Sequence, residues 1–295
     1  MIHRSILGLL VAGALIALSV PALAAEGTPL PPMQKWSFWG PFGKFDRAQL
    51  QRGFKVYREV CQNCHGMTLL SFRNLSEPGG PDFSPAQVAT IAAEYKIKDG
   101  PNDAGDMFER PGRAGDRFPA PFPNDAAARA SNGGALPPDM SVIAKARTYE
   151  RGFPWFLVDM FSQYQEHGVD YITALLNGYE EAPKDFSLPA GTQYNKYFPG
   201  HAIGMPKPIN DDQVPYTDGT PQKIDQYARD VSAFLMWAAE PHLEARKRIG
   251  LQVMIFLFVF AGLLYFTKKK VWKQVTLHPE ELKPRPTGPD EYKAH

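Results

Sequence analysis

The side chains best suited to chemistry stand in one run of five residues. Residues 61–65 read Cys-Gln-Asn-Cys-His and hold both cysteines of the chain. On a helix, positions i and i+3 point the same way, so both thiols can add to two vinyl groups along one porphyrin edge. His65 follows on the same face and can place an imidazole nitrogen at the iron. This spacing is that of c-type haem attachment, so we expect one covalent haem c on Cys61 and Cys64, with His65 as an axial ligand.

Other sites also use two cysteines at this spacing: disulfides, thioredoxin-like redox pairs and zinc sites. A redox pair normally begins a helix after a strand, whereas Cys61 and Cys64 end a predicted helix with no βαβ pattern around them. Zinc needs further soft ligands, and the chain has no third cysteine. A plain disulfide would not explain why a histidine, His65, directly follows the second cysteine. Haem attachment is therefore the interpretation that the residues favour.

A second axial ligand must come from the remaining histidines and methionines of the mature chain. They are His167, His201, His242, His278, His295, Met33, Met67, Met107, Met140, Met160, Met205, Met236 and Met254. Met160 and Met236 lie in predicted helices, where we expect them to pack in the core. Met205 lies in residues 198–208, a loop in which glycines permit close approach to a cofactor and prolines add stiffness. We expect Met205 to be the ligand, with His201 as the alternative and an ordinary loop methionine as the remaining interpretation.

A histidine and a thioether together fill both axial positions and raise the haem potential. That ligand set suits outer-sphere electron transfer rather than oxygen or peroxide chemistry. The two haem propionates need cationic or hydroxylic partners, and Arg147 with Tyr149 or Tyr171 are the candidates. A single arginine is, however, more often a solvated surface charge.

The N-terminus has the pattern of a secretory signal. A basic start is followed by the apolar residues 6–20 and then by Ala22-Leu23-Ala24. An apolar run of 15 residues is short for a membrane span. We therefore expect residues 1–24 to be a cleaved signal peptide and the mature chain to begin near Ala25.

A second apolar stretch lies near the other end, where residues 249–266 are all uncharged. As a helix it is about 27 Å long, against a hydrocarbon core of roughly 30 Å. Basic residues flank it on both sides, at 246–248 and 268–270. Because their numbers are similar, the charges alone do not predict which end of the helix faces the cytoplasm. With an exported N-terminus, we expect residues 25–243 to be a periplasmic haem domain and 267–295 to be a cytoplasmic tail, in the inner membrane of a bacterial cell.

Composition and periodicity indicate a mainly α fold. The 32 basic and 31 acidic residues nearly cancel, which argues against a nucleic-acid binder, and 25 glycines with 28 prolines predict long loops. Apolar spacing and capping signals predict helices at 46–64, 84–95, 138–147, 154–166, 170–177 and 224–240. Residues 100–139 show no period, and no strand pair is evident. We expect a cytochrome c-like helical haem domain with long irregular loops, plus one C-terminal transmembrane helix.

Four segments resemble the cytochrome c1 family, the membrane-anchored haem subunit of ubiquinol:cytochrome c oxidoreductase (the cytochrome bc1 complex, complex III). The segments are residues 40–65 with their Gly-Pro-Phe-Gly, Gln-Arg-Gly and haem-binding motifs, residues 136–147, residues 202–206 and residues 230–241. The haem motif alone is unspecific, whereas the last segment directly before a membrane span is specific. Residues 100–135 do not match the family, and the extra cysteine pair of some bacterial relatives is absent.

For the site, the resemblance implies Cys61 and Cys64 as thioether donors. It further implies His65 and Met205 as axial ligands and Arg147 as the propionate partner.

For function, the resemblance implies electron transfer from a Rieske iron–sulfur protein to cytochrome c, in a respiratory or photosynthetic chain. Cytochrome b is a further expected partner, within a dimeric, multi-subunit, proton-translocating complex. Acidic loop residues, namely Glu180, Glu181, Asp211 and Asp212, are candidates for steering a basic cytochrome c, although acidic loops are usually only solvated.

Two alternative functions share some of these sequence features. A membrane-anchored cytochrome c feeding a terminal oxidase would share the haem motif, the signal and the anchor, but not the segment 230–241. A haem sensor or peroxidase would need an open or displaceable sixth position at the iron.

Overall fold

The computed structural model describes residues 28–149, 151–162, 164 and 166–277. The predicted signal peptide, residues 1–24, and the last part of the predicted tail, residues 278–295, lie outside the described residues. The chain divides into two compact units, one ending at Glu244 and one beginning at Ala245. The first unit carries the haem motif and is called the haem unit below.

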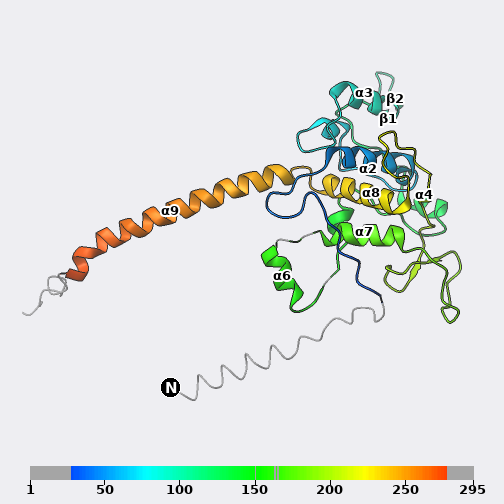
Figure 1. The fold of residues 1–295 in the computed structure, drawn as a ribbon. Helices are drawn as coiled ribbons and strands as arrows, with labels where there is room; N and C mark the ends of the chain where they lie inside the picture. Colours follow the sequence, from blue (N-terminus) through cyan, green and yellow to red (C-terminus); the bar gives the residue numbers. More distant parts are fainter. Residues whose placement is uncertain (1–27, 150, 163, 165, 278–295) are drawn as a thin grey trace, which may run out of the picture. The chain divides into compact units, whose positions relative to one another are not determined.

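The haem unit is built mainly from helices joined by long loops, as expected (Figure 1). Its helices are α2 (Arg47–Glu59), α3 (Pro85–Ala93), α4 (Asp125–Ser131), α5 (Ile143–Ala146), α6 (Trp155–Ser162), α7 (His167–Asn177) and α8 (Ile224–Ala239). Two 3-10 turns, η1 (Cys61–Asn63) and η2 (Phe72–Ser76), complete the helical content of the part of this unit that the structure describes. The helix α9 (Leu243–Leu277) begins at the end of this unit and forms most of the second.

The expectation of no strand pair is wrong, because the described residues hold two small antiparallel pairs. Strand β1 (Lys96–Asp99) pairs with β2 (Phe108–Pro111), with Lys96 opposite Pro111. Strand β3 (Gln193–Tyr194) pairs with β4 (Ala202–Ile203), with Gln193 opposite Ile203. Strands of four and two residues are too short to display the alternation by which a strand is recognised in a sequence.

The predicted capping residues begin the helices where expected. The Asp46 carboxylate accepts a hydrogen bond from the Gln49 backbone N–H at 3.1 Å and caps α2. Ser84 forms a capping box with Gln87 at the start of α3, where Pro85 takes the first helical position. Helix α2 is shorter than predicted, since it ends at Glu59 and the cysteines lie in the following 3-10 turn.

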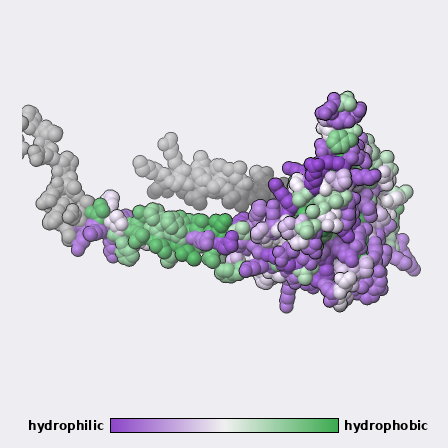
Figure 2. Space-filling view, turned by 90° about the horizontal axis from the view of Figure 1, so that it is seen from above, coloured by the Kyte–Doolittle hydropathy of each residue, from purple (hydrophilic) through white to green (hydrophobic). Residues whose placement is uncertain are grey.

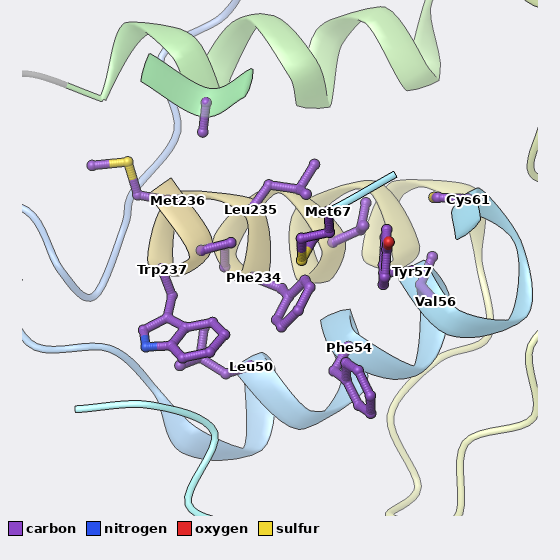
Figure 3. Packing of buried hydrophobic residues seen from close by; sticks show 14 of the residues in the cluster. Leu50, Phe54, Val56, Tyr57, Cys61, Met67, Phe234, Leu235, Met236 and Trp237 are labelled. Carbon is purple, nitrogen blue, oxygen red and sulfur yellow. The ribbon is translucent and has the colours of Figure 1, made fainter. Parts of the chain in front are cut away.

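Three helices form the centre of the haem unit, with α8 between α2 and α7 (Figure 1). Figure 3 shows Phe54 and Tyr57 of α2 beside Phe234 of α8 in the buried cluster. Gly53 lets the two backbones meet, because a Cβ at this position would lie 2.1 Å from the Asp230 carbonyl oxygen. Only glycine fits this crossing without displacing one of the helices.

The same crossing carries an ion pair. Arg52 Nε donates to Asp230 Oδ2 at 2.9 Å, and the Asp230 side chain is fully buried. The hydroxyl of Tyr216 donates to the same oxygen at 3.0 Å. Burial raises the pKa of Asp230, while Arg52 and Tyr216 oppose that shift. The pair therefore joins two of the segments that carry the family resemblance, residues 40–65 and 230–241.

Helix α9 is apolar over most of its length. Within the described part of the chain it is the one helix long and apolar enough to cross a membrane, with a mean hydropathy of 2.3 over its best 18-residue window. Figure 2 shows this hydrophobic band along α9 with hydrophilic residues towards each end. The helix includes all of the predicted span, residues 249–266, and extends beyond it in both directions.

Candidate haem site

The two cysteines and His65 occupy one tight turn after α2. The backbone N–H groups of Cys64 and His65 both donate to the Cys61 carbonyl oxygen, at 3.1 and 2.9 Å. The two cysteines are not joined in a disulfide, and Cys64 is exposed. Figure 3 shows Cys61 where α2 ends, at the margin of the hydrophobic cluster. Burial, aided by Cys64, raises the pKa of the Cys61 thiol.

The imidazole of His65 is oriented by a backbone carbonyl. His65 Nδ1 lies 2.8 Å from the Pro138 oxygen, and an Nδ1–H in this position donates the hydrogen bond. The ring then presents Nε2 as the nitrogen for a metal. Burial lowers the pKa of His65 against the opposing effects of Pro138 and Asp139, which favours the neutral imidazole that binds iron. Two thiols and an oriented imidazole in one turn are the donor set that a c-type haem requires.

Residues 138–141 are fastened to the residues that follow the haem motif. The Met140 backbone N–H donates to the Gly66 carbonyl oxygen at 2.7 Å. Asp139 Oδ2 accepts from both the backbone N–H and the hydroxyl of Thr68, at 2.9 and 2.8 Å. Asp139 Oδ1 accepts from the Ser141 backbone N–H at 2.8 Å. These bonds hold the Pro138 carbonyl against His65.

Asp139 carries a negative charge at this junction. Partial burial works to raise its pKa, but hydrogen bonds from Ser141 and Thr68 outweigh burial and lower it. Sequence reasoning assigned no role to Pro138 or Asp139. Their segment belonged to the family resemblance, but only the fold brings a residue 73 positions away to His65.

Met205 lies in the loop that follows strand β4. Its side chain is partly buried against the hydrophobic cluster. The Tyr179 hydroxyl donates to the Met205 carbonyl oxygen at 3.1 Å and holds the backbone of the loop. A Cβ at Gly204 would lie 3.3 Å from the Cβ of Ala135, so this loop approaches the chain just before residues 138–141. The chain from Ala135 to Pro138 therefore lies close both to the Met205 loop and to His65.

His201, the alternative ligand, is held by other contacts. Its ring stacks on Tyr194 with a centroid separation of 5.3 Å. Its Nδ1 lies 3.2 Å from the Asn195 carbonyl oxygen, and its backbone has a φ of 60°. The ring is thus part of the packing of the β3–β4 hairpin.

The candidate propionate partners fall into two groups. Arg147 is exposed at the end of α5, and Tyr171 is half-buried on α7. Burial raises the pKa of Tyr171, and the charge of Arg147 opposes the shift. Burial raises the pKa of Tyr179, and Tyr171 adds to the shift. The Tyr179 hydroxyl binds the Met205 carbonyl oxygen, which connects it to the Met205 loop. The Tyr149 hydroxyl instead donates to Asp170 Oδ2 at 3.3 Å.

One of the two methionines expected to pack in the core does so. Met236 is buried in α8, whereas Met160 in α6 is 61% exposed. The expectation for Met160 is wrong because α6 is apolar on nearly every side, and a short apolar helix gives no period from which to choose its buried face.

The acidic loop residues also differ in role. Asp211 Oδ1 accepts from the Ile224 backbone N–H at 2.9 Å, at the start of α8, and Oδ2 pairs with Lys223 at 3.1 Å. These bonds lower the pKa of Asp211. Glu180 and Glu181 are exposed in a loop beside Tyr179.

Comparison with known proteins assigns the chain to a family. Residues 36–275 match the model of the Cytochrome C1 family. The chain is 64% identical, over 90% of its length, to cytochrome b/c1 of Bradyrhizobium diazoefficiens, and spans 39% of that longer protein. It is 54% identical to cytochrome c1 of Blastochloris viridis, covering 88% of this chain and 93% of the relative. It is 43% identical to cytochrome c1 of Rhodospirillum rubrum, covering 90% and 96%. The chain therefore belongs to the cytochrome c1 family.

Proposed function

We propose that this chain is the haem c subunit of a ubiquinol:cytochrome c reductase that accepts electrons from a Rieske iron–sulfur protein and passes them to a cytochrome c. Membership of the cytochrome c1 family makes it a haem subunit of the bc1 complex. The observation that carries the electron-transfer role is the turn at residues 61–65, in which two thiols accompany an imidazole whose Nδ1 is already bonded to Pro138.

Three residues of the turn would hold the haem. Cys61 and Cys64 would each carry it as a thioether to one of its vinyl groups. His65 would supply Nε2 to the iron, and the Pro138 carbonyl keeps the ring in the tautomer that this bond needs. The bound haem supplies one-electron chemistry at its iron.

Met205 is the second axial ligand in this proposal. The hydrogen bond from Tyr179 holds the loop that carries it, and its partly buried side chain lies against the hydrophobic cluster. The stacking of His201 on Tyr194 favours Met205 over the alternative. Two protein ligands exclude water and substrates from the metal, which restricts the site to outer-sphere electron transfer. Arg147 and Tyr171 are proposed to bind a propionate.

The chain is proposed to reside in a bacterial inner membrane. Residues 1–24 are removed as a signal peptide, and residues 25–243 form the periplasmic haem domain. Residues 249–266 of α9 span the bilayer, and residues 267–295 remain in the cytoplasm. The length and hydropathy of α9 support the span, and the bacterial relatives support the compartment.

The partners follow from the same proposal. Cytochrome b and the Rieske protein accompany this chain in a dimeric complex. The exposed carboxylates of Glu180 and Glu181 favour a basic cytochrome c as acceptor, because opposite charges accelerate encounter. Asp211 contributes less, since it is paired with Lys223.

Purification from gentle detergent through an affinity tag on the C-terminal tail tests the complex. We expect a b-type cytochrome and a Rieske protein to be recovered with the chain. Recovery of a terminal oxidase instead would favour the alternative function, a membrane-anchored cytochrome c feeding that oxidase. Recovery of the haem-loaded chain without the b-type cytochrome and the Rieske protein would reject the assignment to the complex.

Carbon monoxide tests the closed site. We expect the reduced, intact protein not to bind it, because His65 and Met205 occupy both axial positions. Ready binding by the unmodified protein would support a sensor or peroxidase and contradict the electron-transfer role. The Met205→Leu variant is the positive control, since it opens one position.

A further inference from the structure

Helix α6 and the residue two positions before it expose an unusual number of large apolar side chains. Phe153, Trp155, Phe156, Val158, Met160 and Phe161 are each between 46 and 83% exposed. Figure 1 shows α6 to one side of the α2–α8–α7 centre of the haem unit. Burying large apolar side chains is favourable, so a contiguous patch of this kind is seldom left in water.

The polarity of α6 is the reverse of that of a helix on a water-facing surface. Asp159 is the one charged residue of α6, and it is buried. Arg151 Nη1 binds Asp159 Oδ1 at 2.7 Å, and His167 Nε2 lies 3.4 Å from Asp159 Oδ2. A helix at an aqueous surface turns its charges outward and its apolar residues inward. Here the charge faces the protein and the apolar residues face away from it.

Nearby polar groups do not offset this pattern. The Arg151 guanidinium lies 4.6 Å from the centroid of the Trp155 ring and is itself paired with Asp159. The Ser162 hydroxyl donates to the Asp159 carbonyl oxygen at 3.4 Å. An interface between two proteins carries about one hydrogen bond per 100–200 Å² and a polar rim. The outward-facing side chains of α6 offer a protein partner few hydrogen-bonding groups. This composition therefore favours contact with lipid.

The covalent tether keeps the haem unit near a bilayer. Arg47 Nη2 binds Glu244 Oε2 at 2.8 Å, within the haem unit. The apolar stretch of α9 begins at Ile249, five positions after Glu244, a distance of about 18 Å even for a fully extended chain. Aromatic residues such as Phe153 and Trp155 concentrate at the level of lipid headgroups.

We propose that residues 153–161 insert into the headgroup region of the bilayer that α9 crosses, as a second, interfacial contact of the haem unit with lipid. The proposal rests on α9 as the membrane span and is independent of the haem ligands. Such a contact restricts rotation of the haem unit about its single anchor.

Site-directed spin labelling of the full, haem-loaded chain tests the proposal. Both native cysteines are consumed by haem attachment, so Phe161→Cys provides a single thiol for a nitroxide. The labelled chain is placed in nanodiscs of phosphatidylcholine and phosphatidylglycerol. Collision of the nitroxide with oxygen, which concentrates in lipid, is compared with collision with a water-soluble nickel chelate. We expect the ratio of oxygen to nickel collisions to be several-fold higher than for Glu181→Cys, a control on an exposed acidic loop.

A label at position 161 that collides with nickel as often as the label at position 181 would place α6 in water and overturn the proposal. A label shielded from both reagents would place α6 against protein and overturn it as well. Phe153→Cys is the second position to be labelled, in case Phe161→Cys impairs folding, and the same outcomes apply. Unchanged haem absorption and midpoint potential in both variants separate this test from that of the electron-transfer role.

The same measurement in the purified complex distinguishes lipid from a partner subunit. If oxygen access at position 161 persists there, lipid covers α6 in the assembled state. If it is lost on assembly, a protein partner covers α6 and the lipid contact is rejected.

Discussion

The Nδ1 atom of His65 lies 2.8 Å from the carbonyl oxygen of Pro138. This bond determines which nitrogen of the ring is available to iron, and it comes from a backbone group rather than a side chain. The position of that backbone depends on Asp139, which binds Thr68 through one carboxylate oxygen and Ser141 through the other. The orientation of His65, the proposed haem ligand, thus depends on a carboxylate to which its ring is not hydrogen-bonded.

Replacement of Asp139 by Asn tests this dependence. Asn has an oxygen at only one of the two positions that accept from Thr68 and Ser141, and an NH₂ donor at the other. A hydrogen bond to a charged group is worth about 1.5–3 kcal/mol. We expect covalent haem to be retained, the free energy of unfolding to fall by about 2 kcal/mol, and the midpoint potential to rise, because a negative charge that stabilises ferric iron is removed. Redox titration and denaturant unfolding measure these effects.

The matched control is Asp103→Asn, which removes an exposed carboxylate remote in sequence from the motif. It is expected to change neither quantity. Equal midpoint potentials for the Asp139→Asn variant and the unmodified protein would show that Asp139 does not influence the haem.

Replacement of Met205 by Leu tests the second axial ligand. The thioether favours ferrous iron, so its loss is expected to lower the midpoint potential while Cys61 and Cys64 keep the haem attached. The reduced variant is expected to bind carbon monoxide. Met107→Leu serves as control, since Met107 is 64% exposed on another loop. A potential that does not change would remove Met205 from the iron.

Replacement of Gly53 by Ala tests the crossing of α2 and α8. The added Cβ would lie 2.1 Å from the Asp230 carbonyl oxygen, so the helices must separate. Overpacking of a core typically costs about 1–3 kcal/mol, and we expect a loss at the upper end of this range because backbone atoms must move. Thermal unfolding followed by circular dichroism measures it.

Gly115→Ala is the control for this variant, because a Cβ at Gly115 meets no atom within 4 Å. An equal melting temperature for the two variants would contradict the close approach at Gly53.

The ion pair between Arg110 and Asp116 predicts a pH dependence. Arg110 Nη1 binds Asp116 Oδ2 at 2.6 Å, and this bond is the main cause that lowers the pKa of Asp116 to about 2. A carboxylate with a lowered folded pKa adds stability above its unfolded pKa, near 3.9, and loses that contribution as the pH falls through about 2. Asp116→Asn is therefore expected to be less stable than the unmodified protein above pH 4, with a difference that shrinks towards pH 2.

Denaturant unfolding at a series of pH values measures this difference. A difference that grows as the pH falls would contradict the sign of the shift. Asp103→Asn, whose carboxylate is exposed, is expected to show no such trend.

Features that depend on neighbouring residues could be read from the sequence. The motif at residues 61–65, the caps at Asp46 and Ser84, and the apolar stretch in α9 each depend on residues within a few positions of one another. Helix preference, capping and hydropathy are local properties, so the mainly α class and the candidate donors followed from them.

Features that join distant residues were decided by the tertiary structure. The bond between His65 and Pro138 and the contact of Gly53 with Asp230 each link residues far apart in sequence. No local pattern encodes such contacts, because they arise from the packing of whole elements. The exposure of Met160 was missed for a related reason, since α6 is apolar on nearly every side and only the buried pair of Asp159 with Arg151 decides which face turns inward. The sequence by itself thus determined which groups can bind a haem and a membrane, while the fold decided how His65 is oriented and which surface of α6 is left exposed.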